Sequence, residues 1–263
     1  GGYIGCELAQ VFARAGVEVT IVCRSRLLPQ AEPEIGEALA GYFANEGIKV
    51  VDDLSYRQIR RTESGAALNV NRGGDDVALL AEAVLVTTGR TPNTNGLGLD
   101  EAKVEMHASG GIKVDDRMRT TRPDVYAAGD VTGNNQFVYM AAYGAKIAAE
   151  NALNGDSRRY DNSAMPAVVF TDPQVASVGL TEAQAQGQGV ETKTSVLPLD
   201  YVPRALAARD TRGLIKLIAN ADNDRLIGAH ILAPEGADRI QTAALAIQQG
   251  LTVTQLGEII FPY

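Results

Sequence analysis

The first fifty residues alternate between helical and strand-like patterns, and this alternation restricts the possible folds more than any other feature. Residues 7–15 have the amphipathic pattern of a helix that ends at Gly16, and residues 17–23 (VEVTIVC) form an apolar, β-branched run typical of a buried strand. A second helix is expected over 33–45 and a second strand over 48–51. Alternating strands and helices predict a Rossmann-like α/β fold, a doubly wound parallel sheet.

In the remainder of the chain, the pattern of predicted secondary structure changes twice. Residues 56–80 predict a small antiparallel insertion with a turn at Gly73-Gly74, and residues 83–88 return to the parallel sheet. After a loop-like stretch at 90–105, we expect short strands over 111–116 and 125–128, a helix over 139–153 and a polar linker over 155–163. The last hundred residues predict an α+β module. Its strands are expected at 167–170, 176–179, 192–197, 214–219 and 226–232, followed by helices at 237–249 and 253–260.

The opening residues Gly1-Gly2-Tyr3-Ile4-Gly5 match the second half of a G-x-G-x-x-G turn, with Gly2 and Gly5 as its second and third glycines. Such glycines let the backbone approach a pyrophosphate, and the positive end of the following helix dipole faces the anion. We therefore expect a dinucleotide-binding turn, with a ligand-free glycine turn as the alternative. The first glycine and the first strand would precede Gly1, so we expect the chain to be part of a longer protein.

The end of the predicted strand 17–23 indicates which dinucleotide would bind. A carboxylate at this position would accept a hydrogen bond from the ribose 2′-hydroxyl of NAD. Here Cys23 is followed by Arg24, Ser25 and Arg26, so guanidinium groups that suit a 2′-phosphate stand where the carboxylate would be. The sequence favours NADPH; the alternative is that both arginines are solvated surface charges.

Composition excludes several classes of protein. A net charge of −8 disfavours a nucleic-acid groove, and no apolar run of about 18 residues is present, so we expect no membrane span. Only two cysteines occur, which favours a reducing, cytoplasmic setting without a disulfide framework. Cys6 and Cys23 are interpreted as buried structural thiols. No zinc-type ligand spacing appears, so no metal site is expected within these residues.

Several motifs in a fixed order resemble one family. Residues 86–93 (VTTGRTPN) resemble the A-T-G-R-x-P-N junction of pyridine nucleotide–disulfide oxidoreductases, and residues 120–130 (TTRPDVYAAGD) resemble their second FAD motif. Residues 168–173 (VVFTDP) and 178–182 (VGLTE) are similar to the start of their dimerisation domain. The resemblance extends over the whole chain in the family's order, which makes it more specific than any single motif.

Three further segments resemble the mercury(II)-reducing members of this family. These segments are residues 136–139 (QFVY), 200–205 (DYVPRA) and 261–263 (FPY). Family members that reduce disulfides carry a His-Pro-Thr near the last position, but the only histidines here are His107 and His230, and neither is placed for that role. A dithiol substrate needs proton transfer, whereas delivery of a thiolate-bound soft metal does not need it in the same way.

The resemblance implies three domains and an activity. The domains are a truncated NADPH-binding domain (1–96), the C-terminal part of an FAD-binding domain (97–160) and a dimerisation domain (161–263). The activity is reduction of Hg(II), held as a thiolate complex, by NADPH through FAD and a redox cysteine pair in a cytoplasmic homodimer. That pair and the C-terminal metal-delivering cysteines would lie outside this sequence, so the isolated chain is expected to be inactive.

The resemblance also assigns roles to individual residues. Tyr3 would be a gating tyrosine beside the nicotinamide, and Tyr263 would reach the metal site of the partner subunit; these are the expected catalytic residues. The expected cofactor-binding residues are Gly2, Gly5, Glu7 and Arg24 for NADPH, Gly89 in the nucleotide-domain loop, and Asp130 and Val138 for FAD.

Two alternatives remain open. One is another disulfide oxidoreductase of the dihydrolipoamide dehydrogenase type. The other is a non-catalytic protein that binds a nucleotide and dimerises.

Overall fold

The structure, a computed structural model, describes residues 1–261 and divides the chain into two compact units. One unit combines residues 1–88 with the chain from residue 163 onward, and the other comprises residues 89–162. The expected α/β class is confirmed. The three-domain division at 96/97 and 160/161 stays a prediction.

The N-terminal part of the first unit begins with helix α1 (Tyr3–Arg14), which starts four residues earlier than expected because its first turn follows directly on the glycine turn. Strand β1 (Thr20–Val22), helix α2 (Pro33–Asn45) and strand β2 (Lys49–Val51) follow. The two strands pair in parallel, with Ile21 opposite Val50. This strand–helix–strand arrangement confirms the interpretation of the alternating pattern, although β1 is shorter than the predicted strand.

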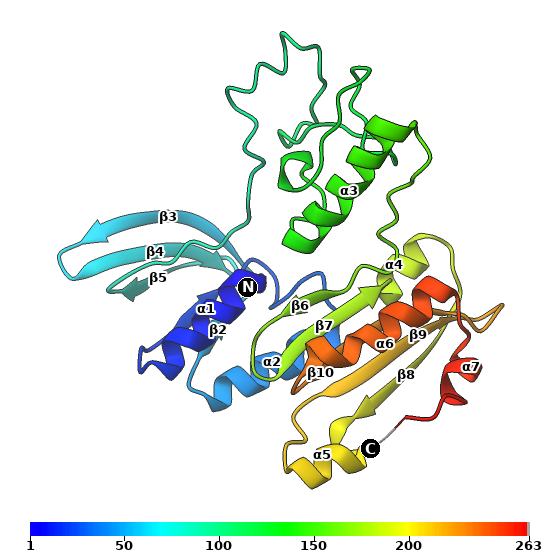
Figure 1. The fold of residues 1–263 in the computed structure, drawn as a ribbon. Helices are drawn as coiled ribbons and strands as arrows, with labels where there is room; N and C mark the ends of the chain where they lie inside the picture. Colours follow the sequence, from blue (N-terminus) through cyan, green and yellow to red (C-terminus); the bar gives the residue numbers. More distant parts are fainter. Residues whose placement is uncertain (262–263) are drawn as a thin grey trace. The chain divides into compact units, whose positions relative to one another are not determined.

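The expected antiparallel insertion is a three-stranded sheet of β3 (Leu54–Thr62), β4 (Gly65–Arg72) and β5 (Asp75–Ala81), shown in cyan in Figure 1. Gly73 and Gly74 both have positive φ and form the predicted turn between β4 and β5. The predicted return of residues 83–88 to the parallel sheet is wrong, because this segment forms no ladder with the described residues. Its apolar side chains, such as Leu85 and Val86, are more than half exposed. An apolar run predicts an extended segment, but a strand also needs a hydrogen-bonding neighbour.

The C-terminal part of the first unit is an antiparallel sheet in the order β6-β7-β10-β9-β8. These strands run over Ala167–Val169, Gln174–Gly179, Leu226–Ala233, Leu214–Asn220 and Thr192–Pro198. The five strands and the long helix α6 (Gly236–Gln249) confirm the α+β prediction, and α7 (Val253–Gly257) follows α6. The short helices α4 (Glu182–Gly187), η2 (Leu199–Tyr201) and α5 (Pro203–Ala208) were not expected.

The central strand β10 is buried on both faces. Because successive side chains of a strand point to opposite faces, each face of β10 belongs to a different core. Ala229 and Ile231 pack with the buried face of α6, which lies across the sheet in Figure 1. Leu232 points the other way and joins the core of α1 and α2. Helices α1 and α2 and the C-terminal sheet therefore share the second of these two cores, which contains Leu232.

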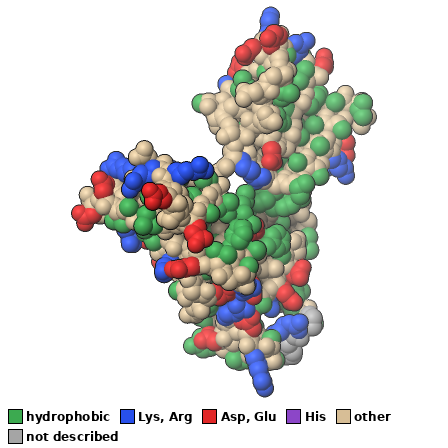
Figure 2. Space-filling view, turned by 90° about the vertical axis from the view of Figure 1, so that its left-hand side faces the viewer, with side chains coloured by type: hydrophobic (Ala, Val, Ile, Leu, Met, Phe, Trp, Pro, Cys, Tyr) green, Lys and Arg blue, Asp and Glu red, His purple; other side chains and the backbone are tan. Residues whose placement is uncertain are grey.

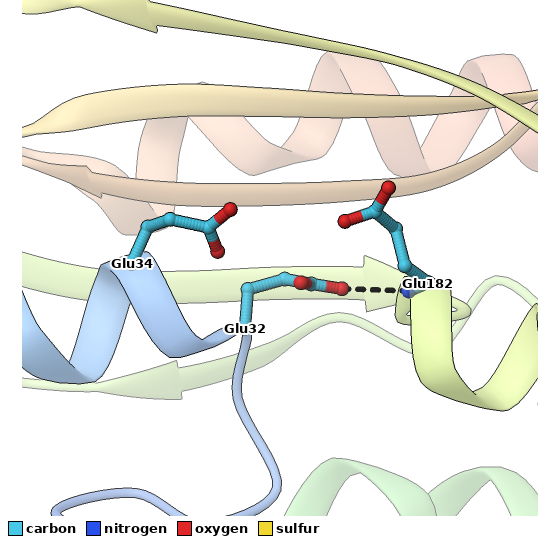
Figure 3. Close-up of side chains that lie close together, drawn as sticks. All are labelled: Glu32, Glu34 and Glu182. Atoms are coloured by element: carbon cyan, nitrogen blue, oxygen red, sulfur yellow. Dashed lines mark hydrogen bonds between the residues drawn. The ribbon is translucent and has the colours of Figure 1, made fainter.

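A buried lysine lies on the face of the sheet that carries Leu232. Lys216 of β9 is opposite His230 of β10, so their side chains share this face. The Lys216 ammonium, 1% exposed, contacts carboxylate oxygens of Glu32, Glu34 and Glu182 at 2.8, 2.9 and 2.5 Å. Figure 3 shows these carboxylates converging from the start of α2 and the start of α4, and Glu32 also accepts a hydrogen bond from the Glu182 amide. All three ammonium donors are used.

In this cluster, burial and hydrogen bonding shift the pKa of Lys216 in opposite directions. Burial alone would lower the pKa of Lys216, but hydrogen bonds to Glu182, Glu32 and Glu34 raise it above its ordinary value. Burial lowers the pKa of His230, whose Nε2 lies 3.0 Å from the Leu180 carbonyl oxygen. His230 Nδ1 and Glu34 Oε2 are buried without a hydrogen-bond partner in the described part of the chain.

The second unit holds helix α3 (Val138–Asn154), the short helix η1 (Asp130–Thr132) and irregular segments. The predicted helix 139–153 and the irregular linker after it are confirmed. The predicted strands 111–116 and 125–128 are wrong, since only isolated bridges form, Met106–Ile112 and Arg119–Tyr126. Asp115 accepts hydrogen bonds from the amides of Arg117 and Arg119, which turns the backbone before a ladder can form.

No helix among the described residues is long and apolar enough to span a membrane. In the face drawn in Figure 2, basic side chains are interspersed with acidic ones and do not form a field of one sign.

Replacing Lys216 tests the buried cluster. Lys216→Met leaves three converging carboxylates without their cation, and we expect the free energy of unfolding to fall by about 3–5 kcal/mol. The matched control is Lys49→Met, which removes an ion pair with Glu18 whose partners are 65% and 77% exposed. The control should change stability by less than about 1 kcal/mol. Urea unfolding followed by circular dichroism measures both, and equal small effects would show that the cluster contributes little.

Candidate functional site

The glycine turn leads straight into helix α1. Gly2 is the N-cap, with extended backbone (φ −88°, ψ −175°), and no side chain caps the helix. The first intrahelical bond runs from the Cys6 amide to the Gly2 carbonyl at 3.0 Å. A side chain built on Gly2 would meet nothing within 4 Å, so the helix N-terminus is open on that side. Such a terminus offers amide donors and a positive dipole to an anion.

Gly5 fixes the distance between α1 and the segment 83–88. A Cβ at Gly5 would lie 2.7 Å from Thr87 Oγ1, closer than real Cβ contacts. The absence of a side chain therefore lets the helix approach this segment, which is the function of the third glycine in a dinucleotide-binding turn. Thr87 lies two residues before Gly89, the first residue of the second unit.

The two arginines after β1 differ in their surroundings. Arg24 is exposed, and its side chain makes no hydrogen bond or ion pair within the described residues. The Arg26 guanidinium instead donates to the carbonyl oxygens of Leu28, Pro29 and Ala31. The structure therefore leaves Arg24 available to an outside anion and commits Arg26 to the backbone of its own loop. Sequence reasoning could not make this distinction.

Glu7 lies one turn into α1, and its carboxylate accepts a hydrogen bond of 2.8 Å from the Phe170 amide. Further along the same helix, Gln10 exchanges hydrogen bonds with the backbone of Asp172, and Arg14 forms an ion pair with the Asp172 carboxylate at 2.9 Å. These contacts join α1 to the segment after β6. Glu7 thus lies where helix α1 meets the C-terminal module.

Tyr3 packs partly buried against the core of α1 and α2. Burial raises the pKa of its phenol, and a hydrogen bond with Ser177 opposes the rise. Ser177 lies on β7, directly opposite His230 of β10. In this conformation the phenol is therefore engaged with the C-terminal sheet.

The predicted flavin-side residues lie in the second unit. Asp130 begins η1, and its carboxylate is half-exposed and 3.5 Å from an Arg90 nitrogen. Arg90 also donates to the Gln136 carbonyl at 2.5 Å. Val138 is the first residue of α3, 85% exposed, and no side chain caps this helix. Gly89 has φ +122° and is the first residue of the unit. Asp130 and Val138 thus flank a short segment that Arg90 holds.

Three predicted residues remain. Tyr263 lies outside the described residues. Cys6 and Cys23 are buried, which agrees with their interpretation as structural thiols, and burial raises the pKa of the Cys6 thiol to about 12. A thiol with so high a pKa is a poor nucleophile near neutral pH.

The arrangement in the first unit fits a pyridine nucleotide on three observations. The helix N-terminus is open, Gly5 permits close packing against Thr87, and Arg24 is exposed beside the end of β1.

Sequence reasoning missed the Lys216 cluster, although a signal was present. Lysine in the apolar run Leu214–Asn220 implies a buried charge that must have partners.

The close approach at Gly5 can be tested by a compensating pair. Gly5→Ala would place its Cβ against Thr87 Oγ1, so we expect a loss of about 1–3 kcal/mol in stability and weaker binding of NADP⁺. Thr87→Ala removes that oxygen, and Thr87 Cβ lies at an ordinary 3.8 Å from the position of the new methyl, so the double variant should regain most of the loss. Calorimetry of unfolding and of NADP⁺ binding measures both. Additive losses in the double variant would contradict the contact.

Comparisons with known proteins identify the family. A family model described as pyridine nucleotide-disulphide oxidoreductase matches residues 1–147, and the dimerisation-domain model of that family matches residues 165–263. Among curated relatives, a mercuric reductase of Acidithiobacillus ferrooxidans is 47% identical over 99% of this chain and 47% of its own length. A mercuric reductase of Streptomyces lividans is 45% identical over the whole chain and 56% of its own length. The chain thus spans about half the length of these relatives.

Solved structures of flavoprotein reductases and related proteins are also similar to this chain. LpdA of Mycobacterium tuberculosis matches with a TM-score of 0.88 and 28% identity over 100% of this chain and 57% of its own. The Cu(II) complex of RclA, an HOCl-induced flavoprotein disulfide reductase of Escherichia coli, matches with a TM-score of 0.86 and 30% identity over 100% and 59% of the two chains. The chain therefore belongs to the pyridine nucleotide-disulphide oxidoreductase family.

Proposed function

We propose that the chain is the NADPH-binding and C-terminal part of a flavoenzyme that reduces Hg(II) to Hg(0). The observation that carries this proposal is its similarity to mercuric reductases over the whole chain, at 42–47% identity in seven of them. The reaction is NADPH + Hg²⁺ → NADP⁺ + H⁺ + Hg⁰, in which the nicotinamide gives up two electrons and mercury gains them. The cofactors are FAD and NADPH, and FAD would supply the electron transfer between the nicotinamide and the metal.

The residues of this chain bind and orient the nucleotide. The open N-terminus of α1 at Gly2 would receive the pyrophosphate, and Gly5 sets the helix close enough to Thr87 for the turn to keep its shape. The exposed guanidinium of Arg24 would pair with the 2′-phosphate. Glu7 and Tyr3, on the same helix, would border the nicotinamide end, where Tyr3 would act as a gate.

The remaining assignments concern the flavin and the partner subunit. Asp130 would bind the ribityl chain of FAD, the Val138 backbone would lie near the flavin ring, and Gly89 would belong to the nucleotide-domain loop. Tyr263 would reach the metal site of a second subunit. The C-terminal module is a dimerisation domain by family, so a homodimer is the expected assembly, with the cytoplasm as its location.

The activity is tested on the full-length flavoprotein that contains this chain. With NADPH and Hg(II) in excess thiol, we expect mercury vapour in a 1:1 ratio to NADPH oxidised, and little oxidation with lipoamide as substrate. The 263-residue chain alone should produce none. Rapid lipoamide reduction without mercury vapour would instead assign a disulfide reductase, and NADPH binding without either activity would assign a non-catalytic nucleotide-binding role.

The choice of NADPH over NADH is tested at Arg24. A hydrogen bond to a charged group contributes about 1.5–3 kcal/mol, so Arg24→Ala in the full-length enzyme should raise the KM for NADPH about 10- to 100-fold and leave that for NADH nearly unchanged. Arg57→Ala is the control, since Arg57 is an exposed arginine on β3 whose one ion pair within residues 1–261 is a long one of 3.9 Å to Asp76. Equal effects of Arg24→Ala on both coenzymes would rule out contact with the 2′-phosphate.

A further inference from the structure

The loop between β1 and α2 is bound to itself by one side chain. The Arg26 guanidinium donates to the carbonyl oxygens of Leu28 at 3.4 Å, Pro29 at 3.1 Å and Ala31 at 2.7 Å. All three acceptors lie within five residues of Arg26. The planar guanidinium presents several donors in a fixed arrangement, so one side chain holds a whole turn of backbone in one conformation.

The conformation that Arg26 holds is unfavourable by itself. Leu28 has φ +47°, a left-handed conformation that costs a residue with a side chain about 1–2 kcal/mol. Its side chain is 1% exposed, and its amide donates to the Gly1 carbonyl at 2.8 Å. The strained residue is therefore the point at which the loop attaches to the glycine turn. Strain of this kind persists only where the surroundings fix it.

Both ends of the loop are fixed as well. The carbonyl oxygens of Arg24 and Ser25 accept hydrogen bonds from the amides of Leu54 and Asp53. At the other end, Glu32 is buried and binds Lys216. Helix α2 closes the remaining side, because a Cβ on Gly36 would lie 2.7 Å from the Leu27 carbonyl oxygen and 3.2 Å from an Arg26 nitrogen. The loop has no room to shift toward α2.

Of the two arginine side chains in this fixed loop, Arg26 is bound to carbonyl oxygens, whereas Arg24 is exposed without a partner among the described residues and its backbone is held by Leu54. We propose that Arg26 is a positioning residue for coenzyme selectivity: by holding three carbonyls of its own loop, it keeps the Arg24 backbone at a fixed place relative to the glycine turn. The inference rests on the proposed NADPH function. A 2′-phosphate then meets a guanidinium whose backbone needs no reordering, which reduces the entropic cost of binding.

The consequence is specific to the 2′-phosphate. Loss of the Arg26 contacts leaves the charge of Arg24 in place but lets the loop sample other conformations. Binding of nucleotides that carry a 2′-phosphate should weaken, whereas binding of those without it should change little. A general structural defect would weaken both.

The test compares 2′,5′-ADP with ADP as probes, by calorimetry on the full-length flavoprotein. The measured quantity is the Kd for ADP divided by the Kd for 2′,5′-ADP, which falls when binding of the 2′-phosphate weakens. Ordering of one side chain costs about 0.5–1.5 kcal/mol, so we expect Arg26→Met to reduce this ratio about two- to tenfold and to leave the Kd for ADP within a factor of two. Arg26→Lys should not restore the ratio, because a flexible ammonium lacks the fixed fork of donors with which the guanidinium holds the three carbonyls.

Further variants separate the possible outcomes. Gly36→Ala keeps Arg26 but crowds the loop, and it should lower the ratio in the same direction even if Arg26→Met does not fold. An unchanged ratio in the folded Arg26 or Gly36 variants would overturn the proposal, and so would full rescue by lysine, which would indicate that Arg26 acts by its charge. Arg24→Ala tests the underlying function. If this variant leaves the ratio unchanged, the NADPH assignment itself fails. If Arg24→Ala lowers the ratio strongly but the Arg26 variants do not change it, only the positioning role is overturned.

Discussion

The ion cluster around Lys216 is the interaction on which the first unit depends. It joins a strand of the C-terminal sheet to the first residues of two helices, α2 and α4, with Lys216 and Glu32 buried and Glu34 and Glu182 partly exposed at its edge. An unpaired ammonium could not be buried there, and neither could an unpaired carboxylate of Glu32. The fold therefore brings residues 32–34, 182 and 216 together as a set, although they are far apart in the sequence.

This constraint extends to the loop between β1 and α2, the proposed nucleotide-binding loop. Glu32 is both a ligand of the Lys216 ammonium and the last residue before α2, so the cluster fixes the far end of the loop that carries Arg24 and Arg26. The near end is fixed by the turn between β2 and β3, and the middle by the Leu28 amide on the glycine turn. A charge in the C-terminal module thereby contributes to the shape of the candidate coenzyme site. On α1, the contact of Glu7 with the Phe170 amide joins the same two parts a second time.

The sequence predicted those elements whose signals are local. The glycine turn, the run 17–23 and the helix 33–45 each carry their pattern within about a dozen residues, and the antiparallel strands of the last hundred residues follow from alternation and turn residues. Residues 83–88 show the limit of this reasoning, because apolar character specifies an extended segment and says nothing of its neighbour. The predicted strands 111–116 and 125–128 failed for a similar reason, since Asp115 captures amides that a ladder would need.

The candidate site shows the same division. Gly2 and Gly5 could be predicted as candidates from their spacing, and Arg24 and Arg26 together from their place after a strand, because a dinucleotide turn depends on residues close together in sequence. The difference between Arg24 and Arg26 could not, since it depends on which carbonyls the folded loop presents. Lys216 required partners from two other segments, and only the fold supplies them.

The most direct test of this account is a crystal structure of the full-length enzyme with NADP⁺ bound. The account predicts the pyrophosphate at the N-terminus of α1 and the 2′-phosphate within hydrogen-bond distance of the Arg24 guanidinium, with Arg26 still bound to the carbonyls of Leu28, Pro29 and Ala31. A 2′-phosphate bound to Arg26, or one directed into solvent with Arg24 turned away, would contradict it.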